Sequence, residues 1–328
     1  MTMRWGVLGA SDFACRFMAP AIHSAEGAEF VALATSSPAK AEPFQAFCPS
    51  LRVIPSYDDL LADPNIDAVY IPLPNHLHIE WTLKALKAGK HVLTEKPIAM
   101  KADQIDALIA ERDKTGLMAA EAFMIVQHPQ FRRARELVQG GAIGRVEHVD
   151  VAFFYDNRTD TENIRNRPET GGGSLPDIGV YTFGSTRWVT GAEPVMDTIR
   201  SRIRFENDVD VYAQVTGQFD GPGGPFTYSS ITSMRLFPRQ EISYHGETGM
   251  IRLSAPYNAN VFGESRLELH RPGLSVTTER WPDAKQYKLQ VEAFGRSVTT
   301  GEPYAWPLEE AKKSQALIDR VFEVAERI

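Results

Sequence analysis

Three side chains with acid–base character stand in two short motifs of the chain. Asp177 and Tyr181 are four residues apart at the start of a predicted helix, and Lys96 stands in the tripeptide Glu95-Lys96-Pro97 after a predicted strand. Residues four apart lie on one face of a helix, so we expect the carboxylate and the phenol to point into one cleft. A phenol with an ordinary pKa of about 10 is a poor base at neutral pH, and a neighbouring ammonium would lower that pKa. Lys96 could supply that ammonium.

A second segment with chemical potential joins the first predicted strand to the first helix. Gly9 stands at the tight-turn position of the dinucleotide fingerprint G-x-G-x-x-G, whereas Ser11 and Ala14 replace its second and third glycines. Glycines in this fingerprint let backbone amides approach a pyrophosphate at the helix N-terminus. Ser11 or Asp12 could equally cap the helix without any ligand. The residues predicted to bind a cofactor here are Gly9, Ser11, Asp12, Phe13 and Ala14.

The end of the second predicted strand bears on the identity of that cofactor. A site for NAD usually offers an Asp or Glu to the ribose diol at this point, but this chain has Thr35, Ser36, Ser37 and Lys40. Hydroxyls and an ammonium can bind a 2′-phosphate that a carboxylate would repel. We therefore expect NADP, with NAD as an alternative. The same residues would also suit a solvated turn followed by a helix start.

Residues 4–122 alternate β-branched segments with helical patterns, which is typical of a parallel sheet covered by helices. The predicted strands are Trp5–Leu8, Phe30–Ala34, Val53–Ile54, Ala68–Ile71, His91–Thr94 and Leu117–Ala120. The predicted helices are Phe13–Ser24, Ala39–Phe47, Ile79–Ala88 and Ala102–Thr115. This pattern predicts an α/β domain over residues 1–122, a doubly wound Rossmann sheet with ligands at the carboxyl ends of its strands.

Beyond residue 123 strands predominate, which predicts an α+β domain over residues 123–328 built on a large, mostly antiparallel sheet. The predicted helices are Gln130–Gln139 and Ser174–Trp188. The predicted strands are Val146–Tyr155, Ile199–Phe205, Val211–Phe219, Thr227–Ser233, Glu241–His245, Met250–Leu253 and Arg266–His270. A final helix over residues 308–328 has an apolar face that should dock on a domain surface. We expect a bare apolar sheet face to bind further copies, giving a homodimer or homotetramer.

The composition argues against several classes of protein. The 42 acidic residues outnumber the 35 basic ones, and no Lys/Arg cluster indicates nucleic-acid binding. No window approaches the roughly 20 apolar residues of a membrane span. The two cysteines, Cys15 and Cys48, are too few for a disulfide framework. With neither an export signal nor a His/Cys cluster of metal-ligand spacing, we expect a cytoplasmic protein without a metal.

Three segments together resemble the Gfo/Idh/MocA family of oxidoreductases: residues 71–78 (IPLPNHLH), Glu95-Lys96-Pro97, and the glycine-rich helix start over residues 171–181. Within that family, residues 121–124 (EAFM) and 128–130 (HPQ) are similar to the branch of dimeric dihydrodiol dehydrogenase and NADP-dependent D-xylose dehydrogenase. The resemblance covers essentially the whole chain. It implies hydride transfer between a nicotinamide and the carbinol carbon of a sugar, polyol or cyclic diol, which needs a base for the hydroxyl proton.

The resemblance also implies roles for individual residues. Tyr181 would exchange the proton with the substrate oxygen, Lys96 would polarise that oxygen, and Asp177 would hydrogen-bond the sugar. The further residues implied at the cofactor are Pro72, Pro74, Asn75, His78, Glu95, Lys96 and Glu121. Those implied at the substrate are Phe123, Ile125, Tyr155, Asn157, Arg165 and Asp177. Relatives often have a cis bond before the proline that corresponds to Pro97.

Plainer alternatives exist for several of these residues. Tyr181 could be a core tyrosine, Lys96 an exposed loop residue, and His78 a solvated residue at a helix N-terminus. Glu121 could touch the carboxamide or pair structurally.

The reaction and substrate also have alternatives. One is reduction of a keto sugar such as 1,5-anhydrofructose; another is a non-catalytic cofactor-binding regulator, against which the presence of both Lys96 and Tyr181 argues. Close relatives have Trp and Arg where this chain has Ile125-Val-Gln127, and many have Arg where it has Ser36, so the substrate stays open.

Overall fold

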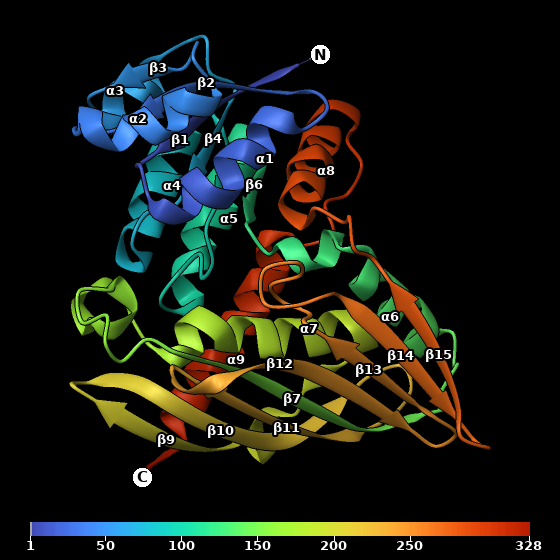
Figure 1. The fold of residues 1–328 in the computed structure, drawn as a ribbon. Coiled ribbons are helices and arrows are strands. Elements are labelled where there is room, and N and C mark those ends of the chain that lie inside the picture. Colours follow the sequence, from blue (N-terminus) through green and yellow to red (C-terminus); the bar gives the residue numbers. More distant parts are fainter. Residues whose placement is uncertain (1) are drawn as a thin grey trace. The chain divides into compact units, whose positions relative to one another are not determined.

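The computed structural model describes residues 2–328, which divide into two compact units (Figure 1). Unit 1 comprises Met1–Gln127 and Lys285–Lys312, and unit 2 comprises His128–Ala284 and Lys313–Ile328. Each unit is therefore built from two stretches of chain. The division into domains over residues 1–122 and 123–328 stays a prediction, to which the structure adds a segment, residues 285–312, that packs with unit 1.

Unit 1 contains a six-stranded parallel sheet. Its strands are β1 (Met3–Leu8), β2 (Ala28–Ala34), β3 (Arg52–Ile54), β4 (Ala68–Ile71), β5 (His91–Thr94) and β6 (Ala119–Glu121). They lie in the order β3-β2-β1-β4-β5-β6, the order of a doubly wound dinucleotide fold. This order confirms the predicted Rossmann sheet. Strands such as β4 are buried along their whole length, as expected for a parallel sheet covered on both faces.

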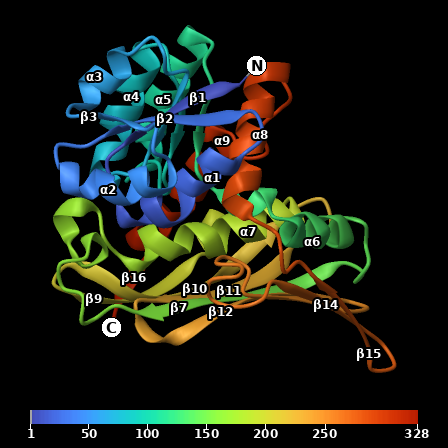
Figure 2. The same ribbon diagram turned by 45° about the horizontal axis from the view of Figure 1, so that its top comes forward.

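Helices cover both faces of this sheet (Figure 2). They are α1 (Ala19–Ser24), α2 (Pro38–Phe47), α3 (Tyr57–Ala62), α4 (His78–Lys87), α5 (Ile105–Thr115) and α8 (Gln286–Thr300). Helices α1 and α8 pack together against β2, whereas α3, α4 and α5 share an apolar cluster on the other face. Two helices were not predicted from the sequence: α3, which has only six residues, and α8, which buries glutamines among its apolar residues.

Two of the predicted helices begin with a wider turn. The π-helix η1 (Ala14–Met18) precedes α1, and the π-helix η7 (Leu175–Gly179) precedes α7 (Val180–Thr190). Both follow the glycine-containing segments that the sequence singled out as ligand-binding. Short π-helical turns inside helices are frequent at functional sites, so the irregularity coincides with the predicted chemistry.

Unit 2 contains a ten-stranded sheet. Its strands are β7 (Val146–Asp156), β8 (Glu193–Pro194), β9 (Arg200–Glu206), β10 (Val209–Asp220), β11 (Phe226–Ser233), β12 (Arg235–Gly246), β13 (Met250–Ser254), β14 (Arg266–Arg271), β15 (Ser275–Arg280) and β16 (Ala325–Arg327). The order is β15-β14-β13-β12-β7-β11-β10-β9-β16, with β8 beside β10. The sheet is mostly antiparallel, as predicted, but β7 pairs with β11 and β9 with β16 in parallel.

The predicted C-terminal helix is shorter than expected. Helix α9 (Leu308–Glu323) stops five residues before the end of the chain, and the last residues form β16 instead. The edge of β9 offers unpaired backbone groups that β16 satisfies. An ion pair between Arg202 and Glu326 accompanies the pairing. Edge pairing of the backbone therefore replaces the final helical turn.

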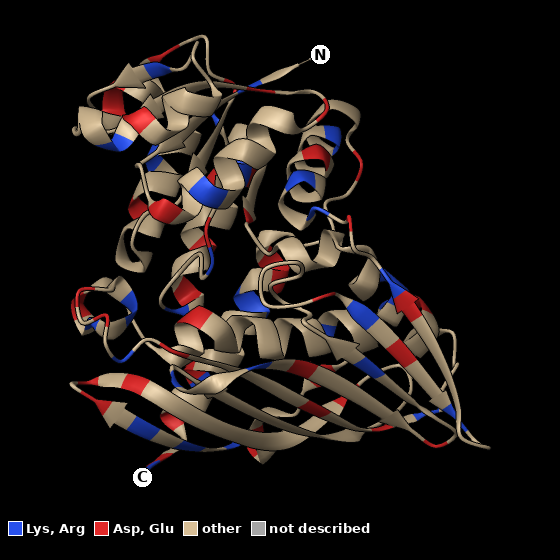
Figure 3. Ribbon diagram, viewed as in Figure 1, with Lys and Arg blue, Asp and Glu red and all other residues tan. Residues whose placement is uncertain are grey.

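The two faces of the unit 2 sheet differ. Helices α6 (Pro129–Gln139) and α7 pack on one face, and none of the described helices of this unit covers the other (Figure 2). The open face is polar: on β10, for example, Gln214 and Thr216 are exposed, whereas Val215 is buried. Lys, Arg, Asp and Glu are interspersed along the strands (Figure 3). The bare apolar face expected from the sequence is therefore not present, and the oligomeric state stays a prediction.

Within residues 2–328, the structure has no helix that combines the length and the apolar composition needed to cross a lipid bilayer.

Candidate active site

The turn after β1 requires a glycine at position 9. Gly9 has φ +100°, and a side chain there would lie 3.0 Å from Leu73 Cδ2 and 3.2 Å from the hydroxyl of Tyr57. Its amide donates a hydrogen bond to the carbonyl of Ala34 (2.9 Å). Both the left-handed conformation and the confined space exclude other residues. The conformation of Gly9 and the side chains around it therefore explain why a glycine stands at this turn.

The residues after Gly9 start the first helix. The hydroxyl of Ser11 accepts a hydrogen bond from the amide of Ala14 (3.1 Å), so Ser11 makes the capping interaction left open in the sequence analysis. Asp12 is exposed, and Ala14 is buried. The ring of Phe13 packs against Phe17 and Tyr287, with centroid distances of 5.3 and 5.5 Å. Contact of these residues with a cofactor stays a prediction.

The segment after β2 lies at the same carboxyl edge of the sheet. Thr35 is buried, and its hydroxyl accepts a hydrogen bond from the amide of Ser37 (3.2 Å). Ser36 and Lys40 are exposed. The segment thus presents a hydroxyl and an ammonium to solvent, as the prediction of a 2′-phosphate site requires.

The segment after β4 is held by a buried histidine. Pro72 is buried, Pro74 and Asn75 are half-buried, and His76 is exposed. His78 has no exposed surface, and its Nδ1 and Nε2 lie 2.7 Å from the carbonyl oxygens of Pro97 and Leu73 respectively. Burial lowers the pKa of His78 to about 4. His78 therefore ties the segment after β4 to the segment after β5, and its direct contact with a cofactor stays a prediction.

The tripeptide Glu95-Lys96-Pro97 follows β5, and its Lys96–Pro97 bond is cis, as the resemblance implied. The Glu95 carboxylate accepts hydrogen bonds from the hydroxyl of Tyr70 (2.6 Å) and from the amide of Lys96 (3.2 Å). Burial raises the pKa of Glu95, and the charge of Lys96 opposes that shift. Lys96 itself is half-buried. Glu95 therefore fixes the backbone from which Lys96 projects.

Glu121, at the end of β6, fixes the same segment from its other side. Its carboxylate accepts hydrogen bonds from the amide of Ile98 (3.0 Å) and from the indole Nε1 of Trp306 (2.9 Å). Burial raises the pKa of Glu121, against the opposing effect of Lys96. The structural pairing considered for Glu121 is therefore present. Phe123 stacks on Trp306 with centroids 4.3 Å apart, and both Phe123 and Ile125 are fully buried, so their contact with a substrate stays a prediction.

In unit 2 a carboxylate is held by two side chains. Asp177, in the π-helix η7, accepts a hydrogen bond from the hydroxyl of Tyr155 (2.6 Å). Its other oxygen lies 2.9 Å from Nε of Arg165. Burial, followed by the nearby Asp177, raises the pKa of Tyr155 well above its ordinary value. Three of the predicted residues thus form one cluster, which presents fixed polar groups suited to a hydroxylated substrate.

Tyr181 lies one turn further along the same helix. Tyr181 is 7% exposed as a residue and Asp177 8%. The Tyr181 ring packs near Phe153 and Tyr257, with centroid distances of 6.0 and 5.5 Å. The aromatic neighbours hold the ring as a core tyrosine would be held, while the remaining exposure leaves room for a role in proton transfer.

Asn157 does not join this cluster through any hydrogen bond described by the structure. Its side-chain oxygen accepts a hydrogen bond from Nη1 of Arg235 (2.9 Å), and its backbone N–H donates to the carbonyl of Met234 (3.3 Å). These contacts tie the loop after β7 to the start of β12. A role for Asn157 in substrate binding stays a prediction.

Asp210 is a site-supporting residue that the sequence analysis missed. Its buried carboxylate accepts hydrogen bonds from the hydroxyl of Ser174 (2.9 Å) and the amide of Leu175 (2.7 Å), at the start of η7. Burial raises its pKa to about 7. A side chain at Gly173, which has φ +132°, would collide with this carboxylate. The available signal was an acidic residue flanked by valines, directly before the predicted strand Val211–Phe219.

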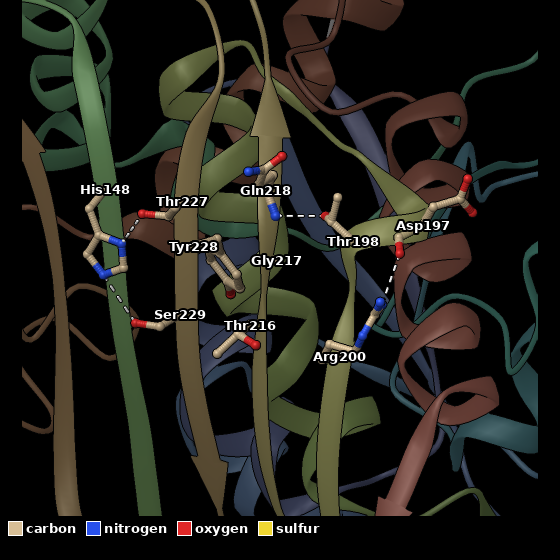
Figure 4. Close-up of a pocket in the computed structure, with 10 residues that line it drawn as sticks. All are labelled: His148, Asp197, Thr198, Arg200, Thr216, Gly217, Gln218, Thr227, Tyr228 and Ser229. Carbon is tan, nitrogen blue, oxygen red and sulfur yellow. Dashed lines mark hydrogen bonds between the residues drawn. The ribbon is translucent and has the colours of Figure 1, made fainter.

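The open face of the unit 2 sheet has a hollow of about 580 Å³ (Figure 4). Its polar lining includes His148, whose ring nitrogens lie 2.8 Å from the hydroxyl of Thr227 and 3.3 Å from that of Ser229. Arg200, on the other side, donates to the carbonyl of Asp197 (2.9 Å). None of the residues predicted from the sequence to act in catalysis or binding lines this hollow.

Family models match both halves of the chain. Residues 3–123 match the profile of the oxidoreductase family with an NAD-binding Rossmann fold, and residues 131–252 match the GFO/IDH/MocA C-terminal domain. The chain is 35% identical to an uncharacterised oxidoreductase of Rhizobium meliloti, over 99% of this chain and 97% of that protein. It is 31% identical to D-xylose 1-dehydrogenase (NADP(+)) 2 of Haloferax volcanii, over 99% and 98% of the two chains.

A similar solved structure is that of a 3-ketoreductase from Actinomadura kijaniata in complex with NADP and TDP-benzene. It has a TM-score of 0.89 and 29% sequence identity, and the match covers 100% of this chain and 99% of that one. Structures of the same reductase have been solved with a lysine replaced by alanine and with a tyrosine replaced by phenylalanine, again with TDP-benzene and NADP.

Proposed function

The chain belongs to the Gfo/Idh/MocA family of NAD(P)-dependent oxidoreductases, and on that premise we propose that it transfers a hydride between NADP and a carbinol carbon of a sugar or polyol. The observation that carries the proposal is the retention of an ordered lysine segment and an ordered Asp177–Tyr181 helix start. A non-catalytic binding protein would have no need of both.

The residues at the carboxyl edge of the unit 1 sheet fit a nicotinamide dinucleotide. Gly9 adopts a left-handed conformation packed against Leu73 and Tyr57, which forms the tight strand-to-helix turn that the pyrophosphate-binding fingerprint requires. The residues proposed to hold the cofactor are Gly9, Ser11, Asp12, Phe13, Ala14, Thr35, Ser36, Ser37, Lys40, Pro72, Pro74, Asn75, Glu95 and Lys96. When bound, the cofactor supplies or accepts the hydride.

Tyr181 is proposed to exchange the proton with the substrate oxygen. Lys96 is proposed to polarise the same oxygen and, when charged, to favour the phenolate form of Tyr181. Asp177 is proposed to orient the sugar by accepting a hydrogen bond from one of its hydroxyls. The pairing of Asp177 with Arg165 and Tyr155 supports this role, since a carboxylate fixed on two sides presents its lone pairs in a constant direction.

Three predicted residues are proposed to act through others. His78 and Glu121 hold the backbone on either side of Pro97, so we assign them a positioning role. Asn157 is assigned to ordering the loop that carries Arg165. Phe123 and Ile125 are proposed to support the residues that line the site, because both residues are fully buried.

NADP is the proposed physiological cofactor. The support is the exposed Ser36 and Lys40 after β2, together with relatives whose names or bound ligands include NADP. A carboxylate that would repel a 2′-phosphate is not found between Thr35 and Lys40.

The proposal is tested by following nicotinamide absorbance with a panel of aldoses, inositols and trans-diols, each with NADP⁺ and with NAD⁺. We expect turnover with at least one sugar or polyol and a higher kcat/KM for NADP⁺. Tight NADP⁺ binding without turnover across the panel would instead support a cofactor-binding regulator.

Reduction of a keto sugar is the second candidate. It is favoured by the similarity to the 3-ketoreductase, whose structure was solved with TDP-benzene. The same residues would act in reverse, with Tyr181 giving its proton to the forming alkoxide. Assays with NADPH and 1,5-anhydrofructose would distinguish the two directions.

A homodimer or homotetramer also stays a proposal. Because the open face of the sheet is polar, a subunit contact there would have to pair charged and hydroxyl side chains such as Arg200 and Thr216. Sedimentation at micromolar concentration that shows only a 36.5 kDa species would contradict it.

A further inference from the structure

The segment that returns to unit 1 places a tryptophan beside the lysine motif. Trp306 has no exposed surface, and its indole stacks on Phe123 with an interplanar angle of 27°. The next residue, Pro307, forms an antiparallel bridge with Ala120, directly before Glu121. The backbone pairing and the ring stacking together fix where the indole N–H points.

The indole N–H donates a hydrogen bond to a carboxylate that also binds the backbone of the lysine motif. Nε1 of Trp306 donates to one oxygen of Glu121 at 2.9 Å, and the other oxygen of Glu121 accepts from the amide of Ile98 at 3.0 Å. Ile98 follows Pro97 directly, two residues after Lys96. A buried carboxylate costs free energy unless donors satisfy it. Trp306 therefore stabilises the Glu121 carboxylate, whose second hydrogen bond fixes the backbone near Lys96.

We propose that Trp306 is a positioning residue for Lys96, which acts by holding the Glu121 carboxylate that anchors the main chain after Pro97. The inference rests on the proposed function in one respect, the role of Lys96 in turnover. It adds that a residue more than 200 positions away in the sequence, outside the nucleotide-binding motifs, sets the geometry of that lysine.

The groups around Glu121 give this arrangement a pH signature. Among the charged or titratable groups around Glu121, Lys96 favours its charged form, whereas Glu121 itself raises the pKa of Glu95 and of Tyr304. Loss of the indole donor removes stabilisation of the charged carboxylate, so the pKa of Glu121 rises further. A protonated Glu121 is a weaker acceptor for Ile98 and places no negative charge near Lys96. The acid limb of the kcat–pH profile should consequently move to higher pH.

The test compares Trp306→Phe with Trp5→Phe in the full-length chain. Phenylalanine keeps an aromatic ring at position 306 but no N–H. Trp5 is the matched control, because it is also fully buried in unit 1 and packs on Phe294, but its Nε1 has no hydrogen-bond partner. Amide hydrogen exchange of the cofactor-free protein measures directly how firmly Glu121 holds the main chain after Pro97. We expect the amides of Lys96 and of residues 98–100 to exchange about tenfold faster in Trp306→Phe, the loss expected for one hydrogen bond to a charged group.

Kinetics with NADP⁺ and D-xylose, or the panel sugar of highest rate, provide the second readout. Trp306→Phe should lower kcat about tenfold, leave the dissociation constant of NADPH within about twofold and move the acid limb upward. Glu121→Gln should reproduce the faster exchange, and Trp306→Phe should add nothing further in that background.

The inference is overturned if Trp306→Phe matches Trp5→Phe in exchange and in pH profile, or if its effect adds to that of Glu121→Gln. If Trp306→Phe does not fold, Glu121→Gln decides: unchanged exchange at Lys96 and at residues 98–100 rejects the proposed role of Glu121 in holding the main chain after Pro97. Failure of the proposed function looks different, because Lys96→Ala would then retain full kcat whatever Trp306→Phe does.

Discussion

The segment that carries Lys96 and the helix start that carries Tyr181 are stabilised in different ways. The lysine segment is held through its main chain, by the carboxylates of Glu95 and Glu121 and by the ring of His78. The helix start is held through Asp210 at its first turn, and Asp177 is held by side chains. A segment outside helices and strands needs side chains to satisfy its backbone, whereas a helix satisfies its own backbone except at its ends.

The contrast extends to electrostatics. In unit 1 the buried groups are two acids and a histidine close to a lysine, and burial shifts each toward its neutral form. In unit 2 Asp177 pairs with an arginine, and burial raises the pKa of a second acid, Asp210. Acidification and alkalinisation should therefore stress the two units differently, and variants can separate them.

The largest effect should come from the two residues proposed to act on the substrate. Lys96→Ala and Tyr181→Phe should each lower kcat by roughly 10²- to 10⁴-fold, the usual cost of losing acid–base help, in steady-state assays with the best panel sugar. Lys87→Ala, an exposed lysine, and Tyr244→Phe, a buried tyrosine of unit 2, are the matched controls and should retain wild-type rates. Equal rates in a variant and its control would remove that assignment.

The helix start of unit 2 should respond to rising pH. Because burial raises the folded pKa of Asp210 from 3.8 to about 7, the folded state holds a proton that the unfolded state releases. The stability of the wild type relative to Asp210→Asn should be highest below the unfolded pKa and fall as pH rises toward 7, by at most about 4 kcal/mol. Urea unfolding of both proteins across that range measures it, and parallel curves would contradict it.

The lysine segment of unit 1 should respond in the opposite direction. Burial lowers the pKa of His78 from 6.5 to about 4, so the unfolded state takes up the proton first. The wild type should lose stability relative to His78→Gln as pH falls through that window, by at most about 3 kcal/mol. The same urea series, continued downward in pH, tests this. A wild type that gains stability relative to the variant on acidification would show that the ring is charged in the fold.

The smallest effect concerns the cofactor alone. Ser36→Asp should lower kcat/KM for NADP⁺ about tenfold, because a carboxylate repels the 2′-phosphate, and leave the KM for the sugar unchanged. Gln45→Glu adds the same charge at an exposed position of α2 and serves as control. A change in sugar KM without a change for NADP⁺ would mean that the segment after β2 does not select the cofactor.

Much of unit 1 could be predicted because its signals are local. The strands read as short apolar segments separated by helical periodicity, and β4 and β5 have the predicted bounds. Helix α8 could not be predicted in this way, since its buried Gln286 and Gln290 break the apolar pattern. The polarity of the open sheet face was also missed, because the sequence analysis inferred a bare apolar face from the shortage of helices and not from the residues that alternate onto it.

The site was predicted in the same uneven way. Asp177, Tyr155 and Arg165 were named from the sequence, and the structure brings them together. Trp306 and Asp210 were not named, because neither stands near a recognisable motif. Their importance arises from what they touch.

The amino-acid sequence alone determined most strands and helices of unit 1, the glycine for the turn after β1 and the residue types that can move a proton, since each shows in residue type or in a pattern over a few positions. Only the tertiary structure decided which buried donors satisfy Glu121 and Asp210 and that the last residues pair with β9 in place of a helical turn. Those outcomes depend on hydrogen bonds between segments tens to hundreds of residues apart, for which local periodicity carries no information.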